Sequence, residues 1–348
     1  MSQFVPPVNY FNKLLVMFVL MLASLGCQVD SDVTSEVSSK QPTPNVSTAI
    51  DLAADSSPKF ASATIFPIYS IAQQIGGDSI EVSLILSSGE SPHTFNPTPG
   101  DRLDSDKSEL MFYIGNGLDE WVTEIANTNT QLVEVGQGIK KINHESSHDD
   151  DHDENHESSH DDDHDDSSIE HHGHDHGPTD PHYWLDPRNG KQIARTIAAQ
   201  YTLIDPANAS SYQENLELFN TEVDELYANL LTQLEVVQNI PFITFHDSWN
   251  YFADAFTLNL VSTFQPPGEH QPSPRYLKKL QDKIELEEVR VLFSEPQFPI
   301  DTLRSFADDN DLEIGVLDPL GGVDGRMTFQ ELLSYNANAL RSSLLEKQ

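Results

Sequence analysis

The sequence contains a single cysteine, Cys27, among its 348 residues. One cysteine cannot form an intrachain disulfide bond, and it cannot supply the thiolate cluster of a metal site. Any metal site in this chain must therefore be built from histidines and carboxylates.

Basic residues are also scarce. Lys and Arg together number 19 against 56 Asp and Glu, which gives a formal net charge of -37. A chain with this balance has no electrostatic attraction for a phosphate backbone, so we exclude nucleic acid as a partner. The hydrophobic content of 37% is below that of an average globular protein. Two polar stretches, 28–57 and 144–176, lower the average for the whole chain.

An apolar run near the N-terminus does not belong to the fold. Residues 14–25 (LLVMFVLMLASL) follow a lysine and are too few to span a bilayer as a helix. The run is typical of the core of a signal peptide, which we place at residues 1–27. It ends in Gly26-Cys27, which resembles a lipoprotein processing site and predicts a lipid anchor on Cys27. The alternative is an ordinary signal peptide with an incidental cysteine.

Residues 28–57, rich in Ser, Thr, Asp and Pro, are predicted to form a flexible tether.

A second polar stretch, 144–176, holds ten His and 14 Asp or Glu with no Lys or Arg, and its segment HESSHDDDHD occurs twice. We expect a disordered loop, because its charge density disfavours collapse. Imidazole and carboxylate groups suit Zn, Ni or Cu(II), so the loop is predicted to offer weak, interchangeable metal sites. The alternative is a solvated acidic loop with no ligand role. The histidines concerned are His144, His148, His152, His156, His160, His164, His171, His172, His174 and His176.

Beyond the tether, strand-like and helix-like segments alternate, which indicates an α/β fold with parallel sheets. A helix is expected at 68–75. Asp205-Pro206 then starts a longer helix, 205–239, whose apolar residues recur every three or four positions. At about 1.5 Å per residue it is long enough to run along both halves of the chain. The expected strands are 63–65, 80–86, 110–114, 241–245, 289–293 and 314–317.

Outside the polar loop only four histidines remain: His93, His182, His246 and His270. His93 and His246 follow expected strands, and His182 follows the loop. We expect these three at strand ends, where open α/β sheets bind ligands.

Two carboxylates, Asp318 and Glu295, also follow expected strands. Three neutral imidazoles and one carboxylate satisfy the tetrahedral coordination of zinc. The sequence therefore predicts a metal site made by these strand-end residues.

Five motifs in this order, SPHTFNPTPGD, DPHYWLDP, FHDSWNYF, FSEPQF and LDPLGG, resemble the ZnuA-like metal-binding lipoproteins of zinc and manganese ABC importers. The resemblance covers about residues 60–346. It implies two α/β lobes joined by a single long helix, with the metal in the cleft between the lobes. We accordingly expect an N-terminal lobe at 58–204, the linking helix at 205–239 and a C-terminal lobe at 240–348.

The resemblance also implies the ligands. The family's ligand positions match His93, His182, His246 and Asp318, and histidine at position 246 favours zinc over manganese. The fourth contact is either Asp318 or water. Glu295 is expected to be structural, and His270 is expected to be an exposed loop residue.

The implied function is capture of Zn(II) outside the cytoplasmic membrane and delivery to the permease and ATPase subunits of an ABC importer. We expect a monomer and no enzymatic activity. The alternatives are a zinc hydrolase that uses the same histidines, a manganese-binding member, and a zinc buffer or sensor without a permease. The hydrolase lacks support, because HExxH occurs only within the acidic repeat, as HESSH at 144–148 and 156–160, and Glu295 is the only plausible base near the strand-end histidines.

Deleting residues 144–176 is expected to leave one tight metal site and to remove several weak ones. Flexible ligands lose conformational entropy when a metal orders them, so they bind more weakly than a preformed cleft. Metal analysis of the mature protein with and without the segment measures this. If the loop captures zinc, the deletion slows uptake only when zinc is scarce. No defect at low zinc, together with faster uptake at high zinc, would instead identify a sensor of excess zinc.

Overall fold

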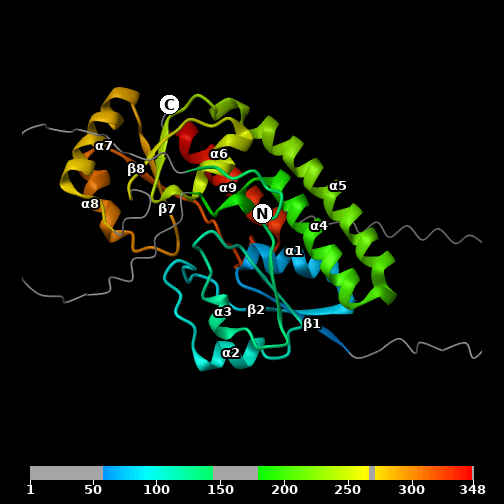
Figure 1. The fold of residues 1–348 in the computed structure, drawn as a ribbon. Helices are drawn as coiled ribbons and strands as arrows, with labels where there is room; N and C mark the ends of the chain where they lie inside the picture. Colours follow the sequence, from blue (N-terminus) through cyan, green and yellow to red (C-terminus); the bar gives the residue numbers. More distant parts are fainter. Residues whose placement is uncertain (1–57, 144–178, 266–270, 347–348) are drawn as a thin grey trace, which may run out of the picture. The chain divides into compact units, whose positions relative to one another are not determined.

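The computed structural model describes residues 58–143, 179–265 and 271–346 (Figure 1). The signal peptide, Cys27, the tether, the loop 144–176 and His270 lie outside these residues, so what the sequence predicts for them stays a prediction.

Two parallel four-stranded sheets confirm the predicted α/β fold. The first contains β1 (Lys59–Ala63), β2 (Ile80–Leu84), β3 (Leu110–Tyr113) and β4 (Gln131–Glu134) in the order β2-β1-β3-β4. The second contains β5 (Phe242–Thr244), β6 (Leu260–Thr263), β7 (Val291–Ser294) and β8 (Glu313–Val316) in the order β6-β5-β7-β8. Both halves thus repeat one strand order, and in each the order reverses between the two central strands, β1 and β3 or β5 and β7. Such a switch point is where open α/β sheets bind ligands.

Helices connect the parallel strands, since a parallel pair needs a crossover. The described helices are α1 (Phe66–Gly76), α2 (Pro99–Ser105), α3 (Val122–Ile125), α4 (Pro187–Ile204), α5 (Ala209–Leu234), α6 (Asn250–Phe256), α7 (Pro274–Glu287), α8 (Asp301–Asp309) and α9 (Phe329–Glu346). None of them combines the length and apolarity needed to cross a membrane.

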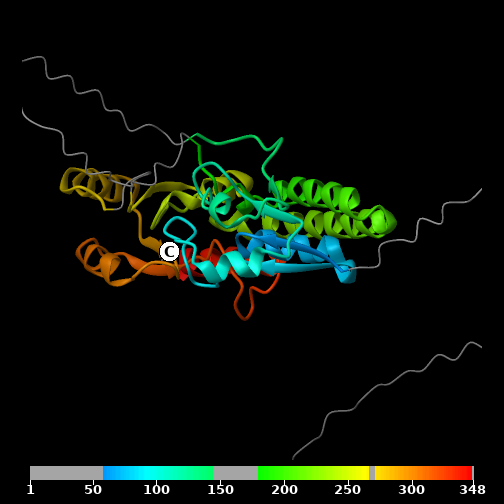
Figure 2. The same cartoon turned by 60° about the horizontal axis from the view of Figure 1, so that its bottom comes forward.

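The long helix is present as α5, which lies alongside α4 (Figures 1 and 2). Short 3-10 turns at Pro206–Asn208 and Glu235–Val237 extend it at both ends, so helical residues fill most of the predicted range 205–239. The α-helix itself is shorter, because 3-10 turns replace it at both ends and Asp205, with φ -141°, is the C-cap of α4. The buried residues of α5 follow the predicted stripe: Tyr212, Leu216, Phe219, Val223, Leu230 and Leu234.

This buried face belongs to an apolar cluster that spans both halves. A single apolar cluster contains Phe112 from β3, Phe219 from α5 and Phe293 from β7. Helix α5 packs on α1, α4 and α9, so it joins the two sheets through side-chain packing as well as through the chain. The loops at the strand ends are therefore carried by a shared scaffold.

The strand predictions were right in position but imprecise at their ends. The strand expected at 63–65 is β1, Lys59–Ala63, because Thr64 and Ile65 already lead into α1. Strands β4 and β6 were not predicted. Both are edge strands with few apolar residues, QLVE and LVST, so the alternation that marks a strand is weak there.

Asp119 ties together the carboxyl ends of β1 and β3, although its carboxylate is fully buried. Its Oδ2 accepts hydrogen bonds from the Thr64 hydroxyl at 2.6 Å and the Ile114 amide at 2.9 Å, and its Oδ1 accepts from the Gly115 amide at 2.8 Å. Burial raises the pKa of Asp119 to about 6, although the hydrogen bonds from Ile114, Thr64 and Gly115 lower it in part. At neutral pH the buried Asp119 carboxylate is charged, and this charge destabilises the folded protein.

Replacing Asp119 by Asn should make the stability of the metal-free protein less dependent on pH between pH 4 and pH 7. The folded carboxyl keeps its proton up to about pH 6, while an unfolded one loses it near ~3.9. The stability of the native protein should therefore fall as pH rises through this window. Asn does not ionise, so the variant avoids this loss in the free energy of unfolding, which amounts to about 3 kcal/mol at most.

Urea unfolding at several values between pH 4 and pH 7 measures the difference. Asp78→Asn is the matched control, because Asp78 is exposed. Parallel stability curves for the native and Asp119→Asn proteins would contradict the prediction.

Candidate metal centre

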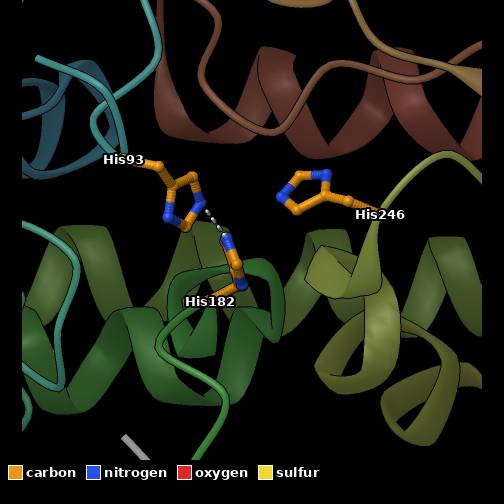
Figure 3. A group of neighbouring side chains, drawn as sticks. All are labelled: His93, His182 and His246. Carbon is orange, nitrogen blue, oxygen red and sulfur yellow. Dashed lines mark hydrogen bonds between the residues drawn. The ribbon is translucent and has the colours of Figure 1, made fainter. Parts of the chain in front are cut away.

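Three loops bring His93, His182 and His246 together (Figure 3). His93 lies in the loop between β2 and α2, and His246 lies two residues after β5. His182 directly precedes a 3-10 turn, Tyr183–Leu185, that leads towards α4. The expectation that His182 follows a strand was wrong, because among the described residues its only nearby β pairing is an isolated bridge at Thr179. His182 is instead placed by the turn and by α4.

The ring nitrogens of these histidines converge. One ligand atom from each ring lies within 4.8 Å of those from the other two. The Nε2 atoms of His93 and His182 are 3.1 Å apart. Two nitrogens bound to one tetrahedral zinc at its usual bond length would be about 3.3 Å apart. The geometry therefore suits a shared metal ion with small adjustments.

Buried carboxylates orient two of the rings. His182 Nδ1 is 2.8 Å from Asp180 Oδ1, and the same oxygen accepts the His182 backbone amide at 2.8 Å. His246 Nδ1 is 2.8 Å from Glu295 Oε1. A carboxylate partner fixes the Nδ1–H tautomer, which leaves the Nε2 lone pair for a metal. Both rings are thus prepared as ligands through Nε2.

The strand pairing explains the contact between His246 and Glu295. In the register of β5 and β7, Thr244 lies opposite Phe293. Continuing this parallel register by two residues brings His246 beside Glu295. Both side chains therefore emerge at the switch point of the second sheet.

Glu295 is fixed by more than the histidine. Its Oε1 also accepts the Ser248 hydroxyl and the Trp249 indole N–H, each at 3.0 Å. Burial by itself lowers the pKa of His246, but the charge and hydrogen bond of Glu295 outweigh it and the pKa is raised. His246 Nε2 has no hydrogen-bond partner among the described residues. The unused nitrogen is what a metal site requires.

Asp318 is buried just beyond β8, but it does not join the three-histidine cluster in the described part of the chain. Its Oδ1 accepts from Gln297 Nε2 at 3.1 Å and from the backbone amides of Leu320 and Gly321. Its Oδ2 pairs with Arg326 at 2.9 Å. To bind a metal, Asp318 would have to exchange some of these contacts, and its role as fourth ligand stays a prediction.

A small cavity surrounds the histidines. Apolar side chains make up much of its wall and limit the access of water, which strengthens electrostatic interactions inside. The other lining residues are Ser91, Pro92, Trp184, Glu295, Gln297, Phe298, Pro319 and Leu320.

Asp180 is a candidate positioning residue that the sequence analysis did not name. It lies inside the motif DPHYWLDP, two residues before His182. An acidic residue at this spacing is the one available signal, because a short loop lets its carboxylate reach back to the ring.

Comparison with known proteins identifies the family of this chain. The profile of the zinc-uptake complex component A (ZnuA) family, described as periplasmic, matches residues 62–343. The high-affinity zinc uptake system protein ZnuA of Brucella abortus (strain 2308) is 32% identical over 301 residues, which cover 81% of this chain and 90% of that protein.

Solved structures resemble the fold. A crystal structure of ZnuA superposes with a TM-score of 0.68 at 26% identity and covers 82% of this chain and 99% of its own. A crystal structure of a ZnuA deletion mutant with zinc bound has the same TM-score of 0.68 and 26% identity, covering 83% of this chain and 98% of its own.

Replacing Glu295 by Ala should weaken the binding of zinc at this centre by about 10- to 100-fold, the usual effect of removing a carboxylate behind a ligating histidine. His246 would lose the partner that fixes its ring and its tautomer. Competition with a chelator of known zinc affinity measures the change.

Asp205→Asn is the control for this substitution. Asp205 is also buried, and it accepts hydrogen bonds from Tyr212 and Asn208. This variant should keep native zinc affinity. Unchanged affinity in Glu295→Ala would show that Glu295 does not orient His246 for a metal.

Proposed function

This chain belongs to the ZnuA family of zinc-uptake binding proteins, and on that premise we propose that its three-histidine centre captures Zn(II) outside the cytoplasmic membrane for import by an ABC transporter. Zinc is the cargo in this function. The protein binds it, shields it from water and gives it up to the permease.

The convergence of three histidine rings is the observation that carries the proposal. His93, His182 and His246 supply borderline nitrogen ligands within 4.8 Å of one another. Such ligands suit Zn(II), whereas Mn(II) prefers sites rich in carboxylate and water oxygens. The carboxylates Asp180 and Glu295 stand behind the rings and balance the charge of the ion without occupying its coordination positions.

The arrangement supports transport over zinc-dependent hydrolysis. A hydrolase needs a general base beside the metal-bound water. Glu295, the base considered from the sequence, already accepts three hydrogen bonds through Oε1 and orients His246. We therefore assign it to ligand positioning and propose that the protein is not an enzyme.

The proposal extends to parts of the chain outside the described residues. We propose that Cys27 carries a lipid anchor and that 28–57 is the tether, which keeps the folded part near the permease. The histidines of 144–176 would add weak sites near the cleft. The support is the sequence pattern: a cysteine directly after a signal-peptide core and ten histidines in one acidic stretch.

We expect cells whose only copy of the gene encodes His246→Ala to stop growing when zinc is scarce. Their initial rate of zinc uptake should also be lost. The loss of one of three imidazoles leaves too few ligands for tight binding. Uptake of radioactive zinc at low external concentration measures the effect, and His270→Ala should behave like the native protein.

Equal effects of the two substitutions would contradict the assignment of His246. Manganese uptake measured in the same cells separates the zinc and manganese alternatives. Dependence of manganese uptake on this protein, without any effect on zinc uptake, would overturn the proposed cargo.

A further inference from the structure

We propose that Asn250 is a positioning residue that fixes His182 and His246 relative to each other. The inference rests on the proposed function of zinc capture and concerns the same centre. Among the described residues the Asn250 amide donates to Asp180 and Asp247 and to neither imidazole, so it would act on the metal site through these neighbours.

The amide group of Asn250 connects the two ligand-bearing segments. Its Nδ2 donates to Asp180 Oδ2 at 3.1 Å and to the backbone carbonyl of Asp247 at 3.0 Å. Asp247 directly follows His246, and Asp180 holds His182 through its other oxygen. One NH₂ group thus joins the peptide behind one ligand to the carboxylate behind the other.

The link crosses between the two halves of the chain. Asn250 is the first residue of α6 and follows β5 of the second sheet, whereas Asp180 precedes α4. The contact spans 70 positions in the sequence. The contact therefore fixes the distance between Asp180 and the peptide that follows His246, which neither segment determines by itself.

The orientation of the Asp180 carboxylate is what Asn250 controls. Asp180 is fully buried, so its oxygens depend on protein donors in place of water. Oδ1 faces His182 and Oδ2 faces Asn250, which fixes the plane of the group from both sides. Without the donor to Oδ2 the carboxylate can rotate, and the ring plane of His182 becomes less defined.

A purely local role makes a different prediction. The bond from Asn250 to the Asp247 carbonyl alone would stabilise the turn before α6. In that case a substitution lowers stability but leaves zinc affinity unchanged. The contact with Asp180 predicts a loss of affinity that depends on Asp180.

The experiment compares the native full-length protein with Asn250→Ala by zinc competition against a chelator strong enough to keep weak sites empty. We expect a loss of about tenfold, the lower end of the range for residues that support a ligating histidine. Asn215→Ala is the matched control, because the amide of Asn215 donates to the Ile75 carbonyl at 3.0 Å from one helix to another. This control should retain native affinity.

A double-mutant cycle tests whether Asn250 acts through Asp180. In an Asp180→Asn background the additional loss caused by Asn250→Ala should be much smaller than tenfold. The visible spectrum of the cobalt(II)-loaded protein gives a readout of ligand geometry, and Asn250→Ala should change its band intensity while Asn215→Ala should not.

Native affinity and an unchanged cobalt spectrum in Asn250→Ala would overturn the inference, and so would an equal loss in both backgrounds. The proposed function is tested separately, since its failure would show as absence of tight zinc binding by the native protein.

Discussion

Two hydrogen bonds from buried histidines to buried carboxylates, His182 to Asp180 and His246 to Glu295, hold the centre in a form that can bind metal. A ligating imidazole must be neutral and must aim one lone pair at the ion. Burial alone would not select the ring nitrogen that carries the proton. The carboxylates make that selection and supply negative charge near the ion, while the contact positions themselves remain nitrogen.

The strand order of the sheets explains how the histidine–carboxylate pair of the second half forms. The neighbouring strands β5 and β7 bring His246 and Glu295 to one switch point, although 49 positions separate them. The opposite side of the centre is held by loops of the first half. The Trp184 indole donates to the Pro319 carbonyl at 2.8 Å, and the Phe329 amide donates to the Ser70 hydroxyl at 2.9 Å. These polar contacts, together with the core around α5, set the spacing between ligands from the two halves.

Charge acts at two levels in this protein. The net charge of -37 produces a field that attracts cations over distances longer than a contact. Inside the cavity the candidate ligands are imidazole rings, and the carboxylates of Asp180 and Glu295 stand one hydrogen bond further away. A histidine centre of this kind selects by ligand type and geometry, whereas the acidic surface attracts any cation. In the proposed function, attraction and selection of the metal are therefore performed by different residues.

Much of the centre could be predicted from the sequence, because its chemistry limits the choice of ligands. A single cysteine excludes thiolate ligands, and only four histidines lie outside the acidic loop. The alternation of short apolar segments with helical apolar stripes was enough to predict the α/β fold and the long helix, which the structure contains as α5. These features depend on composition and local periodicity, which a single sequence displays directly.

The tertiary structure decided which side chains meet. Glu295 and Asp318 both follow a strand, yet one hydrogen-bonds His246 and the other pairs with Arg326. Asp180 and Asn250 gave no periodic signal, since their contact joins segments 70 positions apart. Strand order, register and the packing of α5 create these contacts. They are long-range properties of the folded chain, so the sequence pattern could nominate the ligands and the strand-end carboxylates, but not which side chains Glu295, Asp318 and Asn250 would contact.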